Sequence, residues 1–176
     1  IPNPIVGYYG VIDERIDLDL LDRVASLQPN VSFVMIGPVV KIDEVDLPSH
    51  PNLYYLGGKP YNELPAYLKA IDIAMMPFAL NESTQFISPT KTLEYIAALK
   101  PIISTPIYDV KRDYNNVLSI IDNATAFATA IDYYLNESNV AQERRYQQYR
   151  EILQAVSWDK TVAGMQSNIE AVRTKM

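Results

Sequence analysis

The sequence contains no cysteine and only one histidine, and these absences exclude several kinds of site. Without cysteine there are no disulfides, no cysteine-ligated zinc and no thiol catalysis, and the composition favours a reducing compartment. A single histidine disfavours a Ser-His-Asp triad, and no nucleophile elbow is present. His50 lies in a proline-bearing loop, and we interpret it as a solvated turn residue.

Glycine is also scarce, with six residues in the chain. No Gly-x-Gly-x-x-Gly fingerprint follows the first predicted strand, and no Gly-Lys-Ser/Thr phosphate loop occurs. The missing fingerprint disfavours a nicotinamide-dependent oxidoreductase. Detectable NADH binding would make that hypothesis credible again.

Basic residues are fewer than acidic ones: the chain has 15 Lys and Arg and 21 Asp and Glu, which gives a net charge of −6. This balance argues against nucleic-acid binding, which needs a basic face. No apolar run reaches the roughly 18–20 residues of a membrane span. We expect a cytoplasmic protein, with any association with the inner face of the membrane made through a missing part of a longer polypeptide.

Apolar, strand-like segments alternate with helical patterns along the chain. Strands that are apolar throughout belong in a parallel sheet covered on both faces. We therefore predict an α/β fold: a Rossmann-like, doubly wound parallel sheet of about six strands with helices on both faces and extra C-terminal helices. The predicted strands are residues 5–10, 31–37, 52–57, 71–77, 101–105 and 117–121. The predicted helices are residues 17–27 and 63–70, one from Ser88, one from about 123 to 135, and a helical region from 140 with a break near Ser157.

The chain enters its first strand almost at once, after Ile-Pro-Asn-Pro. We expect all 176 residues to form a single domain excised from a larger enzyme. Asp17 and Asp19 have the spacing of a metal-binding pair. Because they lie at the start of a predicted helix, where carboxylates complement the helix dipole, we interpret them as capping residues.

Four of the seven Lys and Arg residues up to Lys100 follow predicted strands. Parallel α/β sheets bind ligands at the carboxyl ends of their strands. This distribution favours an anionic ligand, although polar loops also gain lysines by chance. The four cations are Arg15, Lys41, Lys59 and Lys91.

Lys91 stands where a cation is unfavourable. Ser88 is the predicted N-cap and Pro89 the first helical residue, so the lysine lies in the first turn, at a cost of roughly 0.3–1 kcal/mol. An anion bound at this helix start would remove the cost. Glu94, one turn further on, would accept hydrogen bonds from hydroxyl groups. Together these residues predict a site for a phosphorylated sugar or nucleotide.

Three stretches carry a family resemblance. In residues 55–77, Leu-Gly precedes a helix, an aspartate and an apolar strand that ends in proline. Residues 88–105 contain Ser-Pro-x-Lys-x-x-Glu before another strand, and Ser157-Trp158 precedes a last helix. The whole chain resembles the C-terminal, donor-binding half of a GT-B retaining glycosyltransferase of group 1. The second stretch is the most specific.

The resemblance implies a nucleotide-sugar donor, with UDP the expected nucleotide, and neither a cofactor nor a metal ion. Glu94 matches the glutamate that binds the ribose hydroxyls. Gly10 matches a glycine close to the diphosphate and sugar, and the segment 57–60, which contains Lys59, matches a loop that meets the base. The region that holds the diphosphate matches Ser88, Pro89, Thr90 and Lys91.

The sequence departs from the family pattern at two places. Phe86 occupies the position of a first glutamate, eight residues before Glu94. The basic residues that usually follow the first strand align with Val11 and Ile16, and Arg15 is their only close substitute.

The residues identify no catalytic base. We expect the acceptor site on a missing N-terminal domain, so that the chain alone is inactive. The alternative, which the missing glutamate favours, is a non-catalytic Rossmann-like nucleotide-binding or regulatory module.

Overall fold

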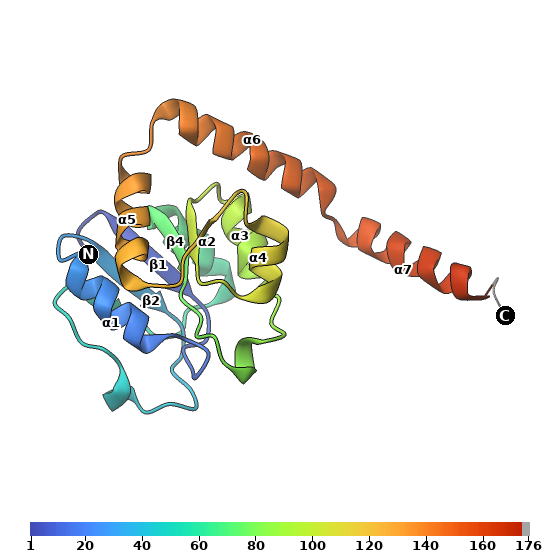
Figure 1. Cartoon of the computed structure of the whole chain (residues 1–176). Coiled ribbons are helices and arrows are strands. Elements are labelled where there is room, and N and C mark those ends of the chain that lie inside the picture. The colour runs from blue at the N-terminus through green and yellow to red at the C-terminus, as the bar shows by residue number, and fades with distance from the viewer. Residues whose placement is uncertain (174–176) are drawn as a thin grey trace.

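The computed structural model describes residues 1–173, and residue 158 by its backbone alone. Six parallel strands form one sheet in the order β3-β2-β1-β4-β5-β6 (Figure 1). This order is that of a Rossmann-type sheet, and it confirms the predicted architecture. The strands are β1 (Ile5–Tyr9), β2 (Ser32–Ile36), β3 (Leu53–Tyr55), β4 (Ile73–Met76), β5 (Ile102–Ser104) and β6 (Ser119–Ile120).

Helices cover both faces of the sheet. α1 and α5 pack against each other on one face, and right-handed crossovers place α2, α3 and α4 on the other (Figure 1). The helices are α1 (Leu18–Leu27), α2 (Leu64–Ala70), α3 (Lys91–Ala97), α4 (Tyr108–Tyr114), α5 (Ala124–Leu135), α6 (Asn139–Ala155) and α7 (Trp158–Arg173). Short 3-10 turns occupy Glu44–Asp46, Tyr61–Glu63 and Glu82–Thr84.

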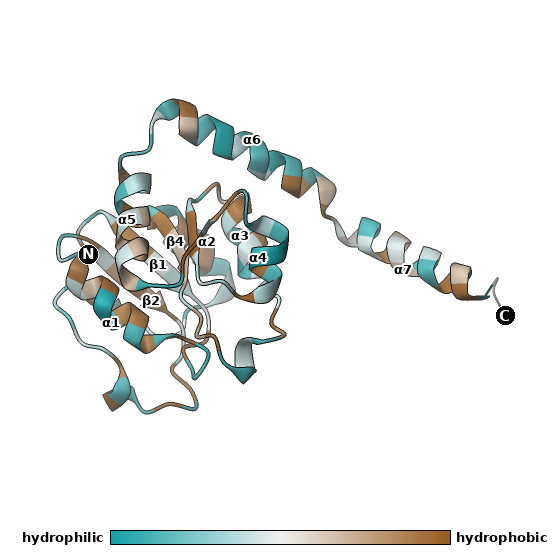
Figure 2. Cartoon of the chain, in the orientation of Figure 1, coloured by the Kyte–Doolittle hydropathy of each residue, from teal (hydrophilic) through white to brown (hydrophobic). Residues whose placement is uncertain are grey.

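The sheet is the centre of the hydrophobic core. All residues of β1, β2, β4 and β5 are buried, and Figure 2 shows the strands as a hydrophobic centre with more polar helices outside. α1 turns Leu20, Leu21 and Val24 into this core. The Asp17 carboxylate accepts the Leu20 N–H at 2.8 Å, which confirms its interpretation as a helix cap.

The structure adds one helix to those predicted and defines the C-terminal helical region. The sequence does not predict α4, because its N-cap position is Ile107, an apolar residue that gives no capping signal. The predicted break near Ser157 is confirmed, since α6 ends at Ala155 and α7 begins two residues after Val156. α6 buries only Arg145 and Tyr149, and α7 extends away from the domain (Figure 1). The tryptophan side chain of the third family stretch lies outside the described residues.

Three glycines with positive φ line the carboxyl ends of β1, β2 and β3. They are Gly10 (φ 145°), Gly37 (φ 153°) and Gly57 (φ 66°). The Gly10 N–H donates to Ile36 O at 2.8 Å, and the Gly37 N–H donates to Gly57 O at 3.0 Å. A Cβ atom on Gly37 would lie 1.8 Å from Gly10 O. Backbone alone therefore forms this edge, at the place where parallel sheets bind ligands.

We expect Gly37→Ala to lower the free energy of unfolding by about 3 kcal/mol or more, because the new methyl group meets a backbone oxygen that cannot move aside. Gly57→Ala is the matched control: it shares a positive φ, but no atom of the described residues lies within 4 Å of the added Cβ, so its cost is about 1 kcal/mol. Denaturant unfolding of both variants measures the difference, and equal costs would contradict the close contact.

Candidate functional site

The loop that follows β1 contains a closed ion pair. Asp13 is 2% exposed, and Arg15 holds its carboxylate with Nε at 2.9 and 3.0 Å and Nη2 at 2.6 Å. Burial alone would raise the pKa of Asp13, but the hydrogen bonds from Arg15 reverse this and lower it. The predicted ligand-binding charge of Arg15 is thus largely neutralised by its neighbour.

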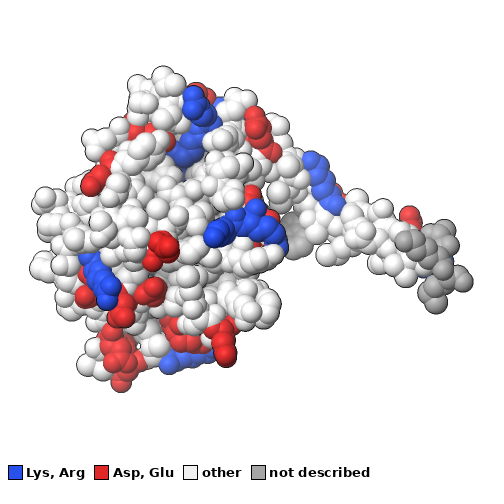
Figure 3. Space-filling view, viewed as in Figure 1, with Lys and Arg blue, Asp and Glu red and all other residues white. Residues whose placement is uncertain are grey.

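The other two loop cations also have partners among the described residues. Lys41 Nζ forms an ion pair with Glu14 Oε1 at 2.9 Å. Lys59 follows the edge strand β3, two strands away from β1, and its Nζ lies 5.9 Å from the centre of the Tyr67 ring. Figure 3 shows basic and acidic side chains interspersed on the face in view, with uncharged surface between them.

α3 begins later than predicted. Ser88 is not its N-cap and Pro89 is not helical: the N-cap is Thr90, and no side chain among the described residues caps the helix. The cause is a tight turn, in which the Thr92 N–H donates to Pro89 O at 3.2 Å before the α-helical ladder starts. Lys91 is consequently the first residue of the helix, even closer to its positive end than the sequence suggested.

Lys91 lies directly over Gly10. A Cβ atom on this glycine would be 2.3 Å from Lys91 Cε and 2.8 Å from Nζ, so the lysine side chain occupies the space that only a glycine leaves open. The ammonium is 5.8 Å from the centre of the Tyr8 ring. Within residues 1–173 it makes no hydrogen bond or ion pair, and burial lowers the pKa of Lys91, against the opposing effect of Glu94.

Glu94 is fixed from the neighbouring strand. The Tyr9 hydroxyl, from the last residue of β1, donates to Glu94 Oε2. The structure thereby brings Gly10, Lys91 and Glu94 together, while Arg15 is held by Asp13. Sequence reasoning missed Tyr9, which is the last residue of a strand that is buried throughout. No spacing could have revealed this contact, because its partners are 85 residues apart.

A cleft of about 630 Å³ opens beside this group. Its walls come from the start of α3, from α4 and from the junction of α6 and α7. Glu94 lines the cleft together with Ser88, Pro89 and Thr90, all from the predicted diphosphate-binding segment. Neither Lys91 nor Gly10 is among the residues that line the cleft, so it reaches the group around Lys91 through Glu94.

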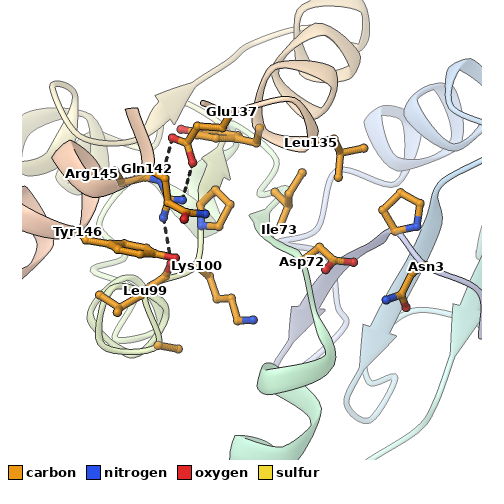
Figure 4. Close-up of a pocket in the computed structure, with 14 residues that line it drawn as sticks. Asn3, Asp72, Ile73, Leu99, Lys100, Leu135, Glu137, Gln142, Arg145 and Tyr146 are labelled. Atoms are coloured by element: carbon orange, nitrogen blue, oxygen red, sulfur yellow. Dashed lines mark hydrogen bonds and ion pairs between the residues drawn. The ribbon is translucent and has the colours of Figure 1, made fainter. Parts of the chain in front are cut away.

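A second cavity, of about 590 Å³, lies at the opposite end of the sheet, where β1, β4 and β5 begin (Figure 4). Its main charges are already paired. Arg145 donates to Glu137 Oε1 at 3.2 Å and Oε2 at 2.7 Å, and to Leu99 O at 2.9 Å. Three tyrosine rings surround the guanidinium at 5.1–5.9 Å. We interpret this cavity as the attachment of α6 to the end of α3.

The Arg145–Glu137 pair is buried, with side chains 6% and 5% exposed. We expect Arg145→Met to lower the free energy of unfolding by about 3–5 kcal/mol, because it leaves the Glu137 carboxylate buried without a partner. Adding Glu137→Leu should restore most of the loss. Arg150→Met, which removes an exposed ion pair with Glu143 on the same helix, is the control and should cost less than about 1 kcal/mol. Equal losses in the two single variants, measured by urea unfolding, would contradict this.

The described residues contain no group of three or more His, Cys, Asp or Glu side chains placed to hold a metal ion. None of the helices in this part of the chain is long and apolar enough to cross a bilayer.

Comparison with known proteins assigns the chain to a family. A family model described as "Glycosyl transferases group 1" matches residues 3–137. The chain belongs to this family of group 1 glycosyltransferases.

One curated relative is TuaH of Bacillus subtilis (strain 168), a glycosyltransferase provisionally assigned to teichuronic acid biosynthesis. It is 30% identical over 104 residues, which are 57% of this chain and 26% of the relative. The chain thus spans about a quarter of the length of the curated relative that it matches.

Solved structures share the fold at low sequence identity. S. aureus TarM, in a complex with UDP and other ligands, is 17% identical with a TM-score of 0.68, over 93% of this chain and 34% of that chain. Anabaena HepE, in complex with UDP-glucose, is 14% identical with a TM-score of 0.61, over 86% of this chain and 49% of that chain. Trehalose 6-phosphate synthase from Burkholderia multivorans is 16% identical with a TM-score of 0.63, over 97% and 44%.

Proposed function

We propose that this chain is the donor-binding domain of a two-domain GT-B glycosyltransferase and that it binds a nucleoside-diphosphate sugar, with UDP as the nucleotide. Family membership supports the class of reaction. UDP is favoured because similarly folded proteins were solved with UDP or UDP-glucose bound.

The observation that carries the proposal is the ammonium of Lys91. It is half-buried at the carboxyl end of the central strand β1, over a glycine, with no hydrogen bond or ion pair inside the described part of the chain. Burial disfavours this cation more than the nearby Glu94 and Asp13 carboxylates offset, since the pKa of Lys91 is lowered. A diphosphate would supply an anionic partner in direct contact. The uncapped N–H groups at the start of α3 add a smaller attraction, since the helix has only seven residues.

The remaining residues extend the site from the diphosphate. Glu94 would accept hydrogen bonds from the ribose hydroxyls, and Ser88 with Thr90 would add hydroxyl contacts to the phosphate oxygens. The loop containing Lys59 would meet the base. Arg15 would contribute less to diphosphate binding, because its charge is already paired with Asp13.

In the proposed transfer, the bond between the anomeric carbon and the terminal phosphate oxygen breaks as an acceptor hydroxyl adds to that carbon, and the proton of this hydroxyl passes to the departing diphosphate. Negative charge grows on the departing diphosphate, and Lys91 stabilises it electrostatically without a metal ion. Retention of configuration and an acceptor site on a further domain of the polypeptide are parts of the proposal. The assignment of the relative to teichuronic acid biosynthesis favours a growing polysaccharide as the acceptor.

We expect wild-type chain to bind UDP, and Lys91→Met to weaken binding roughly 10- to 100-fold, because a hydrogen bond to a charged group contributes about 1.5–3 kcal/mol. Methionine keeps most of the apolar stem over Gly10. Glu94→Ala should weaken binding by about tenfold. Isothermal titration calorimetry with UDP measures all three.

The matched control is Lys69→Ala, which removes an exposed lysine in the last turn of α2. α2 leads into the start of β4, so this lysine lies at the end of the sheet away from the site. Its removal should leave UDP affinity unchanged. Unchanged affinity in both Lys91→Met and Glu94→Ala would refute the site.

A second candidate is a nucleotide-binding or regulatory module without transfer chemistry. The observation that favours it is Phe86, which occupies the position of the family's first glutamate and is 88% exposed. We expect the full-length protein to release UDP from a UDP-sugar in the presence of acceptor, and this chain alone to release none. Binding of UDP-sugar by the full-length protein without turnover, across a panel of acceptors, would instead support the module.

A further inference from the structure

The contact between Tyr9 and Glu94 joins the central strand to the helix that bears the candidate site. The phenol hydroxyl donates to Glu94 Oε2. The other carboxylate oxygen, Oε1, accepts no hydrogen bond from any residue between 1 and 173, and the glutamate lines the cleft beside α3. One oxygen is thus held by the protein and one remains open to a ligand.

Tyr9 is itself held in place. Its peptide N–H donates to the Tyr95 hydroxyl at 3.2 Å, and the two rings meet edge to face with their centres 5.1 Å apart. Tyr9 is 7% exposed and Tyr95 is fully buried. Burial, and then the hydrogen bond to Glu94, raise the pKa of the Tyr9 hydroxyl, so it keeps its proton and remains a donor.

Glu94 needs such support. α3 has seven residues and no side-chain cap among the described residues, and a glutamate side chain loses up to about 2 kcal/mol of rotamer entropy when a ligand fixes it. Phe86 stands exposed at the position of the other family glutamate. In the proposed site, Glu94 is therefore the one family carboxylate that remains to bind the ribose hydroxyls. Fixing it before the ligand arrives reduces the entropy lost on binding.

We propose that Tyr9 is a positioning residue, which orients the Glu94 carboxylate so that Oε1 accepts a hydrogen bond from a ribose hydroxyl of the bound nucleotide. This inference rests on the proposed function, and it adds a residue that acts through Glu94 without touching the ligand. A purely structural role for Tyr9, joining β1 to α3, would affect all ligands alike.

The test compares UDP with 2′,3′-dideoxy-UDP, which lacks both ribose hydroxyls, by calorimetric titration of this chain. We expect the wild type to prefer UDP by about tenfold, and Tyr9→Phe to weaken UDP binding by about fivefold while leaving dideoxy-UDP binding unchanged. In a Glu94→Ala background, Tyr9→Phe should have no further effect. Phenylalanine keeps the ring contact with Tyr95.

Tyr134→Phe is the matched control. It also removes one side-chain hydrogen bond, with Ser119 at 3.0 Å, but it lies on α5 beside the cavity at the other end of the sheet. Its ratio of the two dissociation constants should equal that of the wild type. Because the ratio is taken within one variant, a reduced folded fraction cancels from it.

Tyr9→Phe with an unchanged ratio, whether both affinities fall or neither does, would overturn the positioning role. A wild type that binds UDP and dideoxy-UDP equally would overturn the role of Glu94 in ribose recognition and the Tyr9 inference with it. A wild type that binds neither nucleotide would refute the proposed function itself, which is a distinguishable result.

Discussion

Gly10 lies between two close neighbours, and the arrangement of the site depends on this crowding. On one side, its carbonyl oxygen is so near Gly37 that a Cβ there would be 1.8 Å away; on the other, the Lys91 side chain occupies the volume where its own Cβ would be. The end of the central strand is therefore bare backbone. Only for this reason can a lysine from the start of α3 reach the carboxyl edge of β1.

The treatment of buried charge differs between the two ends of the sheet. At the amino end, Arg145 has both a carboxylate and a carbonyl as partners, so its desolvation is offset within the fold. At the carboxyl end, Lys91 is half-buried at a helix start without a hydrogen bond or ion pair from the described residues, and its pKa is lowered. The first arrangement stabilises a helix attachment. In the second arrangement, the desolvation of the Lys91 ammonium is not fully offset within the fold, and an anion that binds there would offset it.

The sequence predicted the sheet well because its strands are apolar throughout, a pattern that few other folds produce. It predicted α1 from the spacing of leucines and the Asp17 cap. It missed α4, a seven-residue helix without a side-chain cap, and it placed the start of α3 two residues early, because Ser88-Pro89 resembles a cap and first turn but forms a tight turn instead.

Arg15 lies close enough to Lys91 to lower the pKa of that ammonium, but the charges of Arg15 and Lys41 are paired within the fold. Asp13 and Glu14 stand in the same loop as Arg15 and take up the charges of Arg15 and Lys41. A sequence shows that opposite charges are near each other along the chain, but not which of them a ligand could still reach. The position of Lys91 over Gly10 depends on packing between segments 81 residues apart, as does the contact of Tyr9 with Glu94.

The loss of one family glutamate changes what the rest of the site must do. Two carboxylates can share the hydroxyl groups of a ligand, and imprecision in one is tolerated. In the proposed site, with Phe86 in the first position, recognition would depend on the geometry of Glu94 alone. Glu94 stands on a short helix that no side chain of the described residues caps. A rigid donor on β1, one of the two central strands of the sheet, would supply the missing constraint. The proposed site would thus replace a second ligand-binding group with tighter control of the first, at the cost of burying a tyrosine hydroxyl that must always be paired.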